Sequence, residues 1–171
     1  MRLRLGFLSS HGGSNVQAVL DAISQHRLDG EARLVIGNNK DSMALQRAMR
    51  AGVPSVHLSS ATHPDPAALD AAIRDALAAS GAELVVLAGY IKKIGPLTLA
   101  RFRGRILNIH PALLPKHGGK GLYGRKVHEA VLAARERETG VSIRVIDEHY
   151  DTGPILAQVC GLVEPEDTVE T

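Results

Sequence analysis

The segment Arg105–Pro115, with the sequence R-I-L-N-I-H-P-A-L-L-P, carries an amide and an imidazole side chain two residues apart. A short apolar run leads into Asn108 and His110 and stops at Pro111. Because strand side chains alternate between faces, Asn108 and His110 are predicted to point the same way, at a strand end where open α/β sheets place their sites. Such a pair can hydrogen-bond a developing oxyanion and handle a proton, which is the chemistry of acyl or formyl transfer. The alternative is a strand end whose polar residues only bond turn backbone.

A glycine turn after the first apolar run is a second candidate site. Residues Ser10–Asn15 have the sequence S-H-G-G-S-N, and apolar residues at helical spacing follow. Free N–H groups and the dipole at such a helix N-terminus favour a phosphate. Ser14 and Gln17 also match a capping box, which would give the segment a purely structural role. The G-x-G-x-x-G pattern is absent, so a nucleoside monophosphate fits better than a dinucleotide.

Three carboxylates lie in the connection D-E-H-Y-D-T-G-P at 147–154, between two apolar runs. If Asp151 approaches His110, it favours the imidazolium and raises the pKa of that ring, which makes His110 a proton donor near neutral pH. The alternative is that Asp151 only caps its own Thr-Gly-Pro turn.

Several classes of chemistry are disfavoured. The remaining histidines lack metal-ligand spacing, so no metal is expected. No serine lies in a G-x-S-x-G context, and Gly118–Gly121 lacks the Ser or Thr of a phosphate-binding P-loop. The formal net charge of +2 comes without a basic block, so no nucleic acid is expected as a partner.

The single cysteine, Cys160, excludes an internal disulfide and suggests a cytoplasmic setting; we expect it in the core of a late strand. The apolar run near the N-terminus is too short for a signal sequence, and no stretch is long enough to span a membrane.

Apolar runs alternate with helical patterns, which predicts an α/β fold: a Rossmann-like, open, mostly parallel sheet with helices on both faces. Expected strands are 3–8, 32–36, one near Val56, 84–88, one ending at His110, 141–146 and 155–159. Expected helices begin at Ser14 and about Ser42, and span 66–80, a stretch between Gly95 and Gly104, and part of 123–136.

Two helices allow finer predictions. In 66–80, Leu69, Ile73 and Leu77 share one face, and Asp70 and Arg74 are spaced for a surface ion pair. In 123–136 we expect four residues to point inward: Val127, Ala130, Val131 and Ala134.

Residues 1–171 are expected to form one domain. Glu164–Thr168 has the acidic composition of a helix start, but too few residues follow to sustain a turn. We therefore expect a further C-terminal helix beyond residue 171.

Five motifs together resemble the folate-dependent formyltransferases, specifically the phosphoribosylglycinamide formyltransferases of purine synthesis. They are H-G-G-S-N at 11–15, N-N-K at 38–40, L-A-G-Y at 87–90, N-I-H-P-A-L-L-P at 108–115 and D-T-G-P at 151–154. The resemblance covers the whole chain, and it implies the formyltransferase fold.

The resemblance implies that 10-formyltetrahydrofolate donates a formyl group to the amine of glycinamide ribonucleotide, without a metal or a covalent enzyme intermediate. By motif position, Gly13, Ser14 and Asn15 would contact the ribonucleotide. Asn108 and protonated His110 would stabilise the oxyanion, and Asp151 would keep His110 charged. The folate would be lined by Ile91, Lys92, Lys93, Ile94 and Asn108.

By the same resemblance, Ser142 would order the site through water. Lys92 stands where an arginine is commoner in the family, which keeps the charge but loses the planar fork. The loop after Pro115 departs from the family's usual form, so none of its residues is assigned a role. The two substrates are the expected partners, for a monomer or homodimer.

Other formyltetrahydrofolate enzymes remain alternatives: a methionyl-tRNA formyltransferase, a sugar-amine formyltransferase or a formyltetrahydrofolate hydrolase. The tRNA enzyme normally carries an additional tRNA-binding domain, and the hydrolase an N-terminal regulatory domain. A non-catalytic nucleotide-binding module is the alternative from another class.

Overall fold

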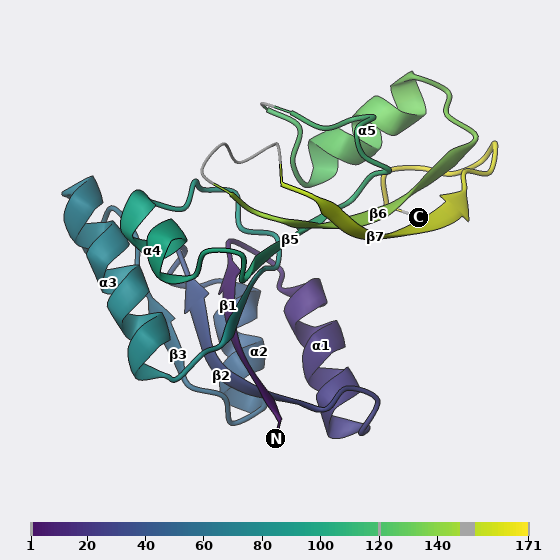
Figure 1. The fold of residues 1–171 in the computed structure, drawn as a ribbon. Coiled ribbons are helices and arrows are strands. Elements are labelled where there is room, and N and C mark those ends of the chain that lie inside the picture. The colour runs from purple at the N-terminus through teal and green to yellow at the C-terminus, as the bar shows by residue number, and fades with distance from the viewer. Residues whose placement is uncertain (1, 120, 148–152, 171) are drawn as a thin grey trace. The chain divides into compact units, whose positions relative to one another are not determined.

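The computed structural model describes residues 2–119, 121–147 and 153–170. Its elements alternate between strands and helices from β1 to β5 (Figure 1). Hydrogen-bonded neighbours follow the strand order β3-β2-β1-β4-β5-β6-β7. β1 pairs with β2 and β4, and β2 pairs with β3, all in parallel, whereas β6 and β7 are antiparallel. The predicted α/β class with a mostly parallel sheet is therefore confirmed.

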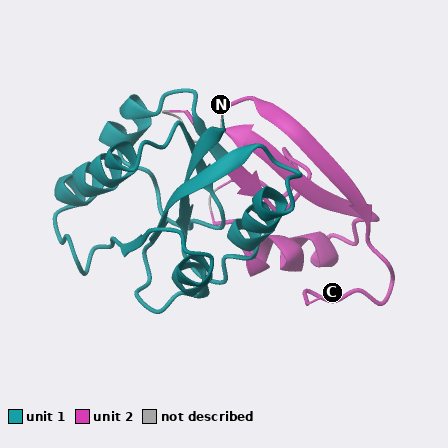
Figure 2. Ribbon diagram, turned by 90° about the horizontal axis from the view of Figure 1, so that it is seen from below, with its two compact units in different colours: residues 1–107 teal, residues 108–171 magenta. Residues whose placement is uncertain are grey.

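The elements are, in chain order, β1 (Leu3–Ser9), α1 (Ser14–Ser24), β2 (Gly30–Gly37), α2 (Met43–Arg50), β3 (Ser55–His57), α3 (Pro66–Ala79), β4 (Leu84–Leu87), α4 (Pro96–Arg101), β5 (Ile106–His110), α5 (Arg125–Ala133), β6 (Glu138–Val145) and β7 (Ile155–Leu162). The chain divides into two compact units, residues 1–107 and residues 108–171 (Figure 2).

In unit 1, the residues 1–107, helices cover both faces of the sheet. A side chain at Gly6 of β1 would meet Leu77 of α3, whereas one at Gly37 of β2 would meet Leu45 of α2. Gly37 is paired with Ser9, three residues after Gly6 on β1, so Gly6 and Gly37 face opposite sides. Helices α1 and α2 contact each other, as do α3 and α4. The predicted covering of both faces is confirmed here.

The core of unit 1 consists of apolar strand and helix residues that exclude water. Buried strand residues run without the alternation of a half-exposed sheet, as expected when both faces are covered. The fully buried side chains of this core include Phe7, Leu8, Val16, Val35, Ile36, Leu77, Val85 and Leu87.

Unit 2, the residues 108–171, contains α5 and the β6–β7 pair. Val127 and Val131 are buried as predicted and Ala130 is half-buried, but Ala134, one residue beyond the end of α5, is exposed, contrary to the prediction. Cys160 was expected in the core and is instead exposed. It lies on β7, which is last in the strand order and exposed along its whole length. An apolar run shows that a strand forms, but not whether anything covers it.

Candidate active site

The N-terminus of α1 keeps its backbone N–H groups clear of any capping side chain. Its N-cap residue is Gly13, in the left-handed conformation with φ 67°, and no side chain caps the helix. The alternative of a Ser14–Gln17 capping box is therefore not formed, since the Gln17 side chain donates to Asp21 instead, at 2.8 Å. A helix end left open in this way is suited to receive an anion.

Helix α2 fixes the glycine turn from the other side. A β-carbon on Gly13 would lie 2.6 Å from the α-carbon of Ala44, so only glycine allows this approach. The Ala44 N–H donates to the carbonyl of His11, and the Arg47 guanidinium donates to the carbonyl of Gly12 at 2.9 Å. The turn that carries Ser14 and Asn15 is thus held in place before any ligand arrives.

Ser10 links this turn to the segment that contains Ile91. The Ser10 side chain is fully buried. Its N–H donates to the carbonyl of Gly89 at 3.1 Å, and its hydroxyl oxygen accepts from the N–H of Ile91 at 2.9 Å. One residue therefore fixes the distance between two candidate binding segments within unit 1.

The segment from Ile91 to Ile94 presents three exposed side chains and one buried one. Ile91, Lys92 and Lys93 are exposed, whereas Ile94 is 6% exposed. The buried Ile94 anchors the segment by packing, whereas the other three side chains are exposed at the surface.

In unit 2, His110 is a buried imidazole at the end of β5. It is 9% exposed, and its Nε2 lies 2.9 Å from the carbonyl oxygen of His117. Because a carbonyl can only accept, Nε2 carries a proton in this contact. Asn108 is half-buried and lies two residues earlier on the same strand, so the two residues share a strand face, as predicted.

Ser142 fixes the turn that follows His110. This fully buried hydroxyl donates to the carbonyl of Ala112 at 2.6 Å and accepts from the N–H of Leu114 at 3.0 Å. It also accepts from the Gln158 amide at 2.8 Å. One donated and two accepted bonds fill the capacity of a hydroxyl group. Ser142 thus holds the backbone of residues 112–114, while its predicted role of ordering the site through water stays a prediction.

The loop after Pro115 is tied to Glu136. The Lys116 ammonium lies 2.9 Å from one oxygen of that carboxylate, and the His117 Nε2 lies 3.2 Å from the other. The hydrogen bond from Lys116, followed by that from His117, holds the pKa of Glu136 below its ordinary value of 4.5. Residue 117 thus joins Glu136 through its side chain and His110 through its carbonyl.

Lys116, His117 and Glu136 also line an open hollow of about 800 Å³, which is formed by residues 113–117, 135–139 and 162. Of the predicted site residues that the structure describes, none lines this hollow. We therefore do not place the predicted chemistry in this hollow.

Comparison with known proteins places this chain in a family. The model of the family described as formyl transferase matches residues 3–171. The chain belongs to the formyl transferase family. A chloroplastic phosphoribosylglycinamide formyltransferase of Arabidopsis thaliana is 41% identical over 99% of this chain, and the chain spans 58% of that relative. Phosphoribosylglycinamide formyltransferase of Haemophilus influenzae is 34% identical, with 98% of this chain and 76% of the relative covered.

Among solved structures, this chain is similar to glycinamide ribonucleotide transformylase 1 from Symbiobacterium toebii. The TM-score is 0.90 at 37% identity, with 99% of this chain and 77% of that chain covered. The predicted formyltransferase fold is confirmed. The chain spans little more than half the length of the plant relatives that it matches.

The site residues predicted from the sequence fall into two groups along the chain. Gly13, Ser14, Asn15 and the segment 91–94 belong to unit 1, and Asn108, His110 and Ser142 belong to unit 2. Asp151 lies outside the described residues, so its predicted role stays a prediction. Sequence reasoning missed Ser10, whose only signal was its place directly before the glycine turn.

Proposed function

We propose that this chain transfers the formyl group of 10-formyltetrahydrofolate to the amine of glycinamide ribonucleotide. The observation that carries the proposal is the pairing of Asn108 with His110 on one face of β5, His110 being buried and held by a backbone carbonyl. The names of relatives at 32–41% identity over nearly the whole chain support it.

The ribonucleotide is proposed to bind by its phosphate at the N-terminus of α1. The free N–H groups after Gly13 supply donors and the helix dipole supplies a favourable field, while Ser14 and Asn15 add polar side chains. The folate donor is proposed to lie along Ile91–Ile94 and against Asn108. The exposed Lys92 and Lys93 offer positive charge to an anionic ligand.

In the proposed reaction, the lone pair of the substrate amine attacks the formyl carbon, and the carbonyl π electrons move to oxygen. The Asn108 amide and the His110 imidazolium donate hydrogen bonds to this oxyanion. Asp151 is proposed to stabilise the imidazolium and to help remove the amine proton. Collapse of the tetrahedral intermediate breaks the bond to the folate nitrogen, which takes up a proton as tetrahydrofolate leaves.

A spectroscopic assay of tetrahydrofolate formation tests the proposal. The chain is supplied with 10-formyltetrahydrofolate and either glycinamide ribonucleotide, an amino sugar nucleotide or no acceptor. We expect product only with glycinamide ribonucleotide. Product with the sugar would identify a sugar-amine formyltransferase, product without an acceptor a hydrolase, and nucleotide binding without product an inert module. Each of these would contradict the proposal.

Substitution of the paired residues tests the chemistry directly. We expect Asn108→Ala and His110→Ala each to lower turnover by at least about a hundredfold, because each removes one oxyanion donor. His128→Ala, at a half-buried histidine of α5, is the control and should keep normal turnover. Near-normal turnover in both test variants, with folding shown by circular dichroism, would refute the assigned roles.

A further inference from the structure

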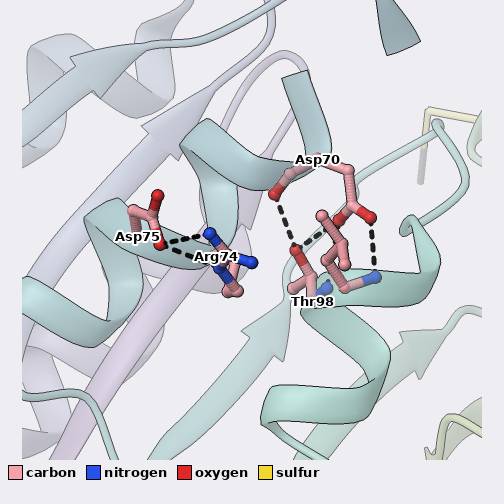
Figure 3. Close-up of polar contacts among 5 residues, drawn as sticks. Asp70, Arg74, Asp75 and Thr98 are labelled. Carbon is pink, nitrogen blue, oxygen red and sulfur yellow. Dashed lines mark hydrogen bonds and ion pairs between the residues drawn. The ribbon is translucent and has the colours of Figure 1, made fainter. Parts of the chain in front are cut away.

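Asp70 is a buried carboxylate that has no role in the proposed reaction. It lies in the middle of α3 and is only 6% exposed. The spacing predicted a surface ion pair with Arg74, and this prediction is wrong: Arg74 instead pairs with Asp75 at 2.8 Å (Figure 3). A carboxylate is costly to bury unless it is hydrogen-bonded, so the partners of Asp70 indicate what it does.

Within the described ranges, the hydrogen-bond donors to the Asp70 carboxylate lie at the start of α4. One carboxylate oxygen accepts from the Leu97 N–H at 2.7 Å. The other accepts from the Thr98 N–H at 3.1 Å and from the Thr98 hydroxyl at 2.6 Å. Figure 3 shows Asp70 reaching from α3 to Thr98, while Arg74 and Asp75 interact separately.

The carboxylate takes the place of an N-cap side chain that α4 lacks. The N-cap residue of α4 is Gly95, which makes no side-chain capping bond. A β-carbon on Gly95 would collide with the carboxyl group of Asp70, so glycine is the residue that allows the close approach. A six-residue helix with one turn of free N–H groups gains its cap from a side chain 27 residues earlier.

Helix α4 begins at Pro96, two residues after Ile94, so Asp70 fixes the C-terminal end of the segment Ile91–Ile94. The other end is fixed by the buried Ser10 hydroxyl, which accepts from the Ile91 N–H. Between these two anchors stand the exposed side chains of Ile91, Lys92 and Lys93. If either anchor were removed, the ligand would have to order these residues when it binds. The lost conformational entropy would weaken its affinity.

We propose that Asp70 is a positioning residue for the formyl donor: by capping α4, it holds Ile91–Ile94 in the conformation that receives the folate. The inference rests on the proposed function. It assigns to Asp70 an effect on binding of the folate donor. The ribonucleotide site at Gly13 and the residues Asn108 and His110 are held by other contacts and should not be affected.

The test uses Asp70→Asn, Asp70→Ala and Thr98→Val, with Asp75→Asn as the matched control on the same helix. We expect KM for the folate donor to rise about three- to tenfold in Asp70→Asn and Thr98→Val, as for one or two lost hydrogen bonds, and further in Asp70→Ala. The kcat and the KM for the ribonucleotide should stay within about twofold. Asp75→Asn should match the wild type, because the Asp75 side chain is 66% exposed and its ion pair is with Arg74 at the surface of α3.

Hydrogen exchange of residues 88–99 in the ligand-free chain provides a readout independent of catalysis. Exchange there should increase in the Asp70 and Thr98 variants but not in Asp75→Asn. Equal changes in kcat and in both KM values, or an unchanged donor KM, would overturn the proposal. If the wild type uses no folate donor at all, the proposed function fails and donor positioning fails with it, while faster exchange would still identify the anchor. Thr98→Val keeps the test valid should Asp70→Ala not fold.

Discussion

The Ser142 hydroxyl supports the turn after His110 through two backbone hydrogen bonds. Ser142→Ala removes three hydrogen bonds from a fully buried site, two of them to the backbone of Ala112 and Leu114. We expect the free energy of unfolding to fall by about 1–3 kcal/mol, because buried polar groups lose their partner. Urea unfolding measures this. The control is Ser24→Ala, because this exposed hydroxyl at the end of α1 bonds to one carbonyl only; it should change stability by less than about 0.5 kcal/mol. An equal loss of stability in both variants would contradict the role assigned to Ser142.

For single residues, the sequence predicted which side chains could do chemistry better than it predicted their hydrogen-bond partners. The face shared by Asn108 and His110 follows from strand alternation, which is local. The partner of Asp70 lies 27 residues away on another helix, and the partner of Ser10 lies 81 residues away. Such contacts leave no periodic signal, so residue spacing pairs Asp70 with Arg74 and indicates no partner for Ser10.

At the scale of the elements, the two neighbouring glycines before α1 should respond differently to substitution. Gly13 has φ 67° and would press a β-carbon against Ala44, whereas Gly12 has open space around it and no left-handed conformation. We expect Gly13→Ala to cost about 1–3 kcal/mol of stability and to weaken ribonucleotide binding. Gly12→Ala is the control and should change both quantities little. Thermal unfolding and calorimetric titration would check this, and indistinguishable variants would remove Gly13 from the proposed phosphate site.

The elements themselves were largely predictable, because long apolar patterns fix their type. The expected helix 66–80 and the observed α3, Pro66–Ala79, differ by one residue. β6 begins at Glu138, three residues before the predicted strand, because Glu138 and Thr139 pair with Leu162 and Gly161 of β7. Polar residues enter a strand when a neighbouring strand supplies partners, and a single run of sequence does not reveal that neighbour.

On the scale of the whole molecule, the described residues include carboxylates whose charge is stabilised by nearby cations. A hydrogen bond from Arg4 lowers the pKa of Glu83, one from Arg125 lowers that of Glu170, and those from Lys116 and then His117 lower that of Glu136. A lowered pKa in the folded state means that the unfolded state binds protons more readily as acid is added. The stability from these pairs is present above the ordinary value of 4.5 and is lost as pH falls through the lower folded-state values.

The urea midpoint of the chain should therefore stay level above about pH 5 and fall as the pH is lowered below 4.5. The fall should be shallower in 1 M NaCl, because surface pairs are screened by salt. Glu136→Gln should make the fall of the urea midpoint below pH 4.5 less steep, because the glutamine amide carries no charge that acid could neutralise. Thr62→Val, which removes a hydroxyl but no carboxylate, should leave the steepness unchanged. A midpoint that rises toward pH 3, or an acid limb equally steep with and without Glu136, would show that these pairs do not set the acid stability of the chain.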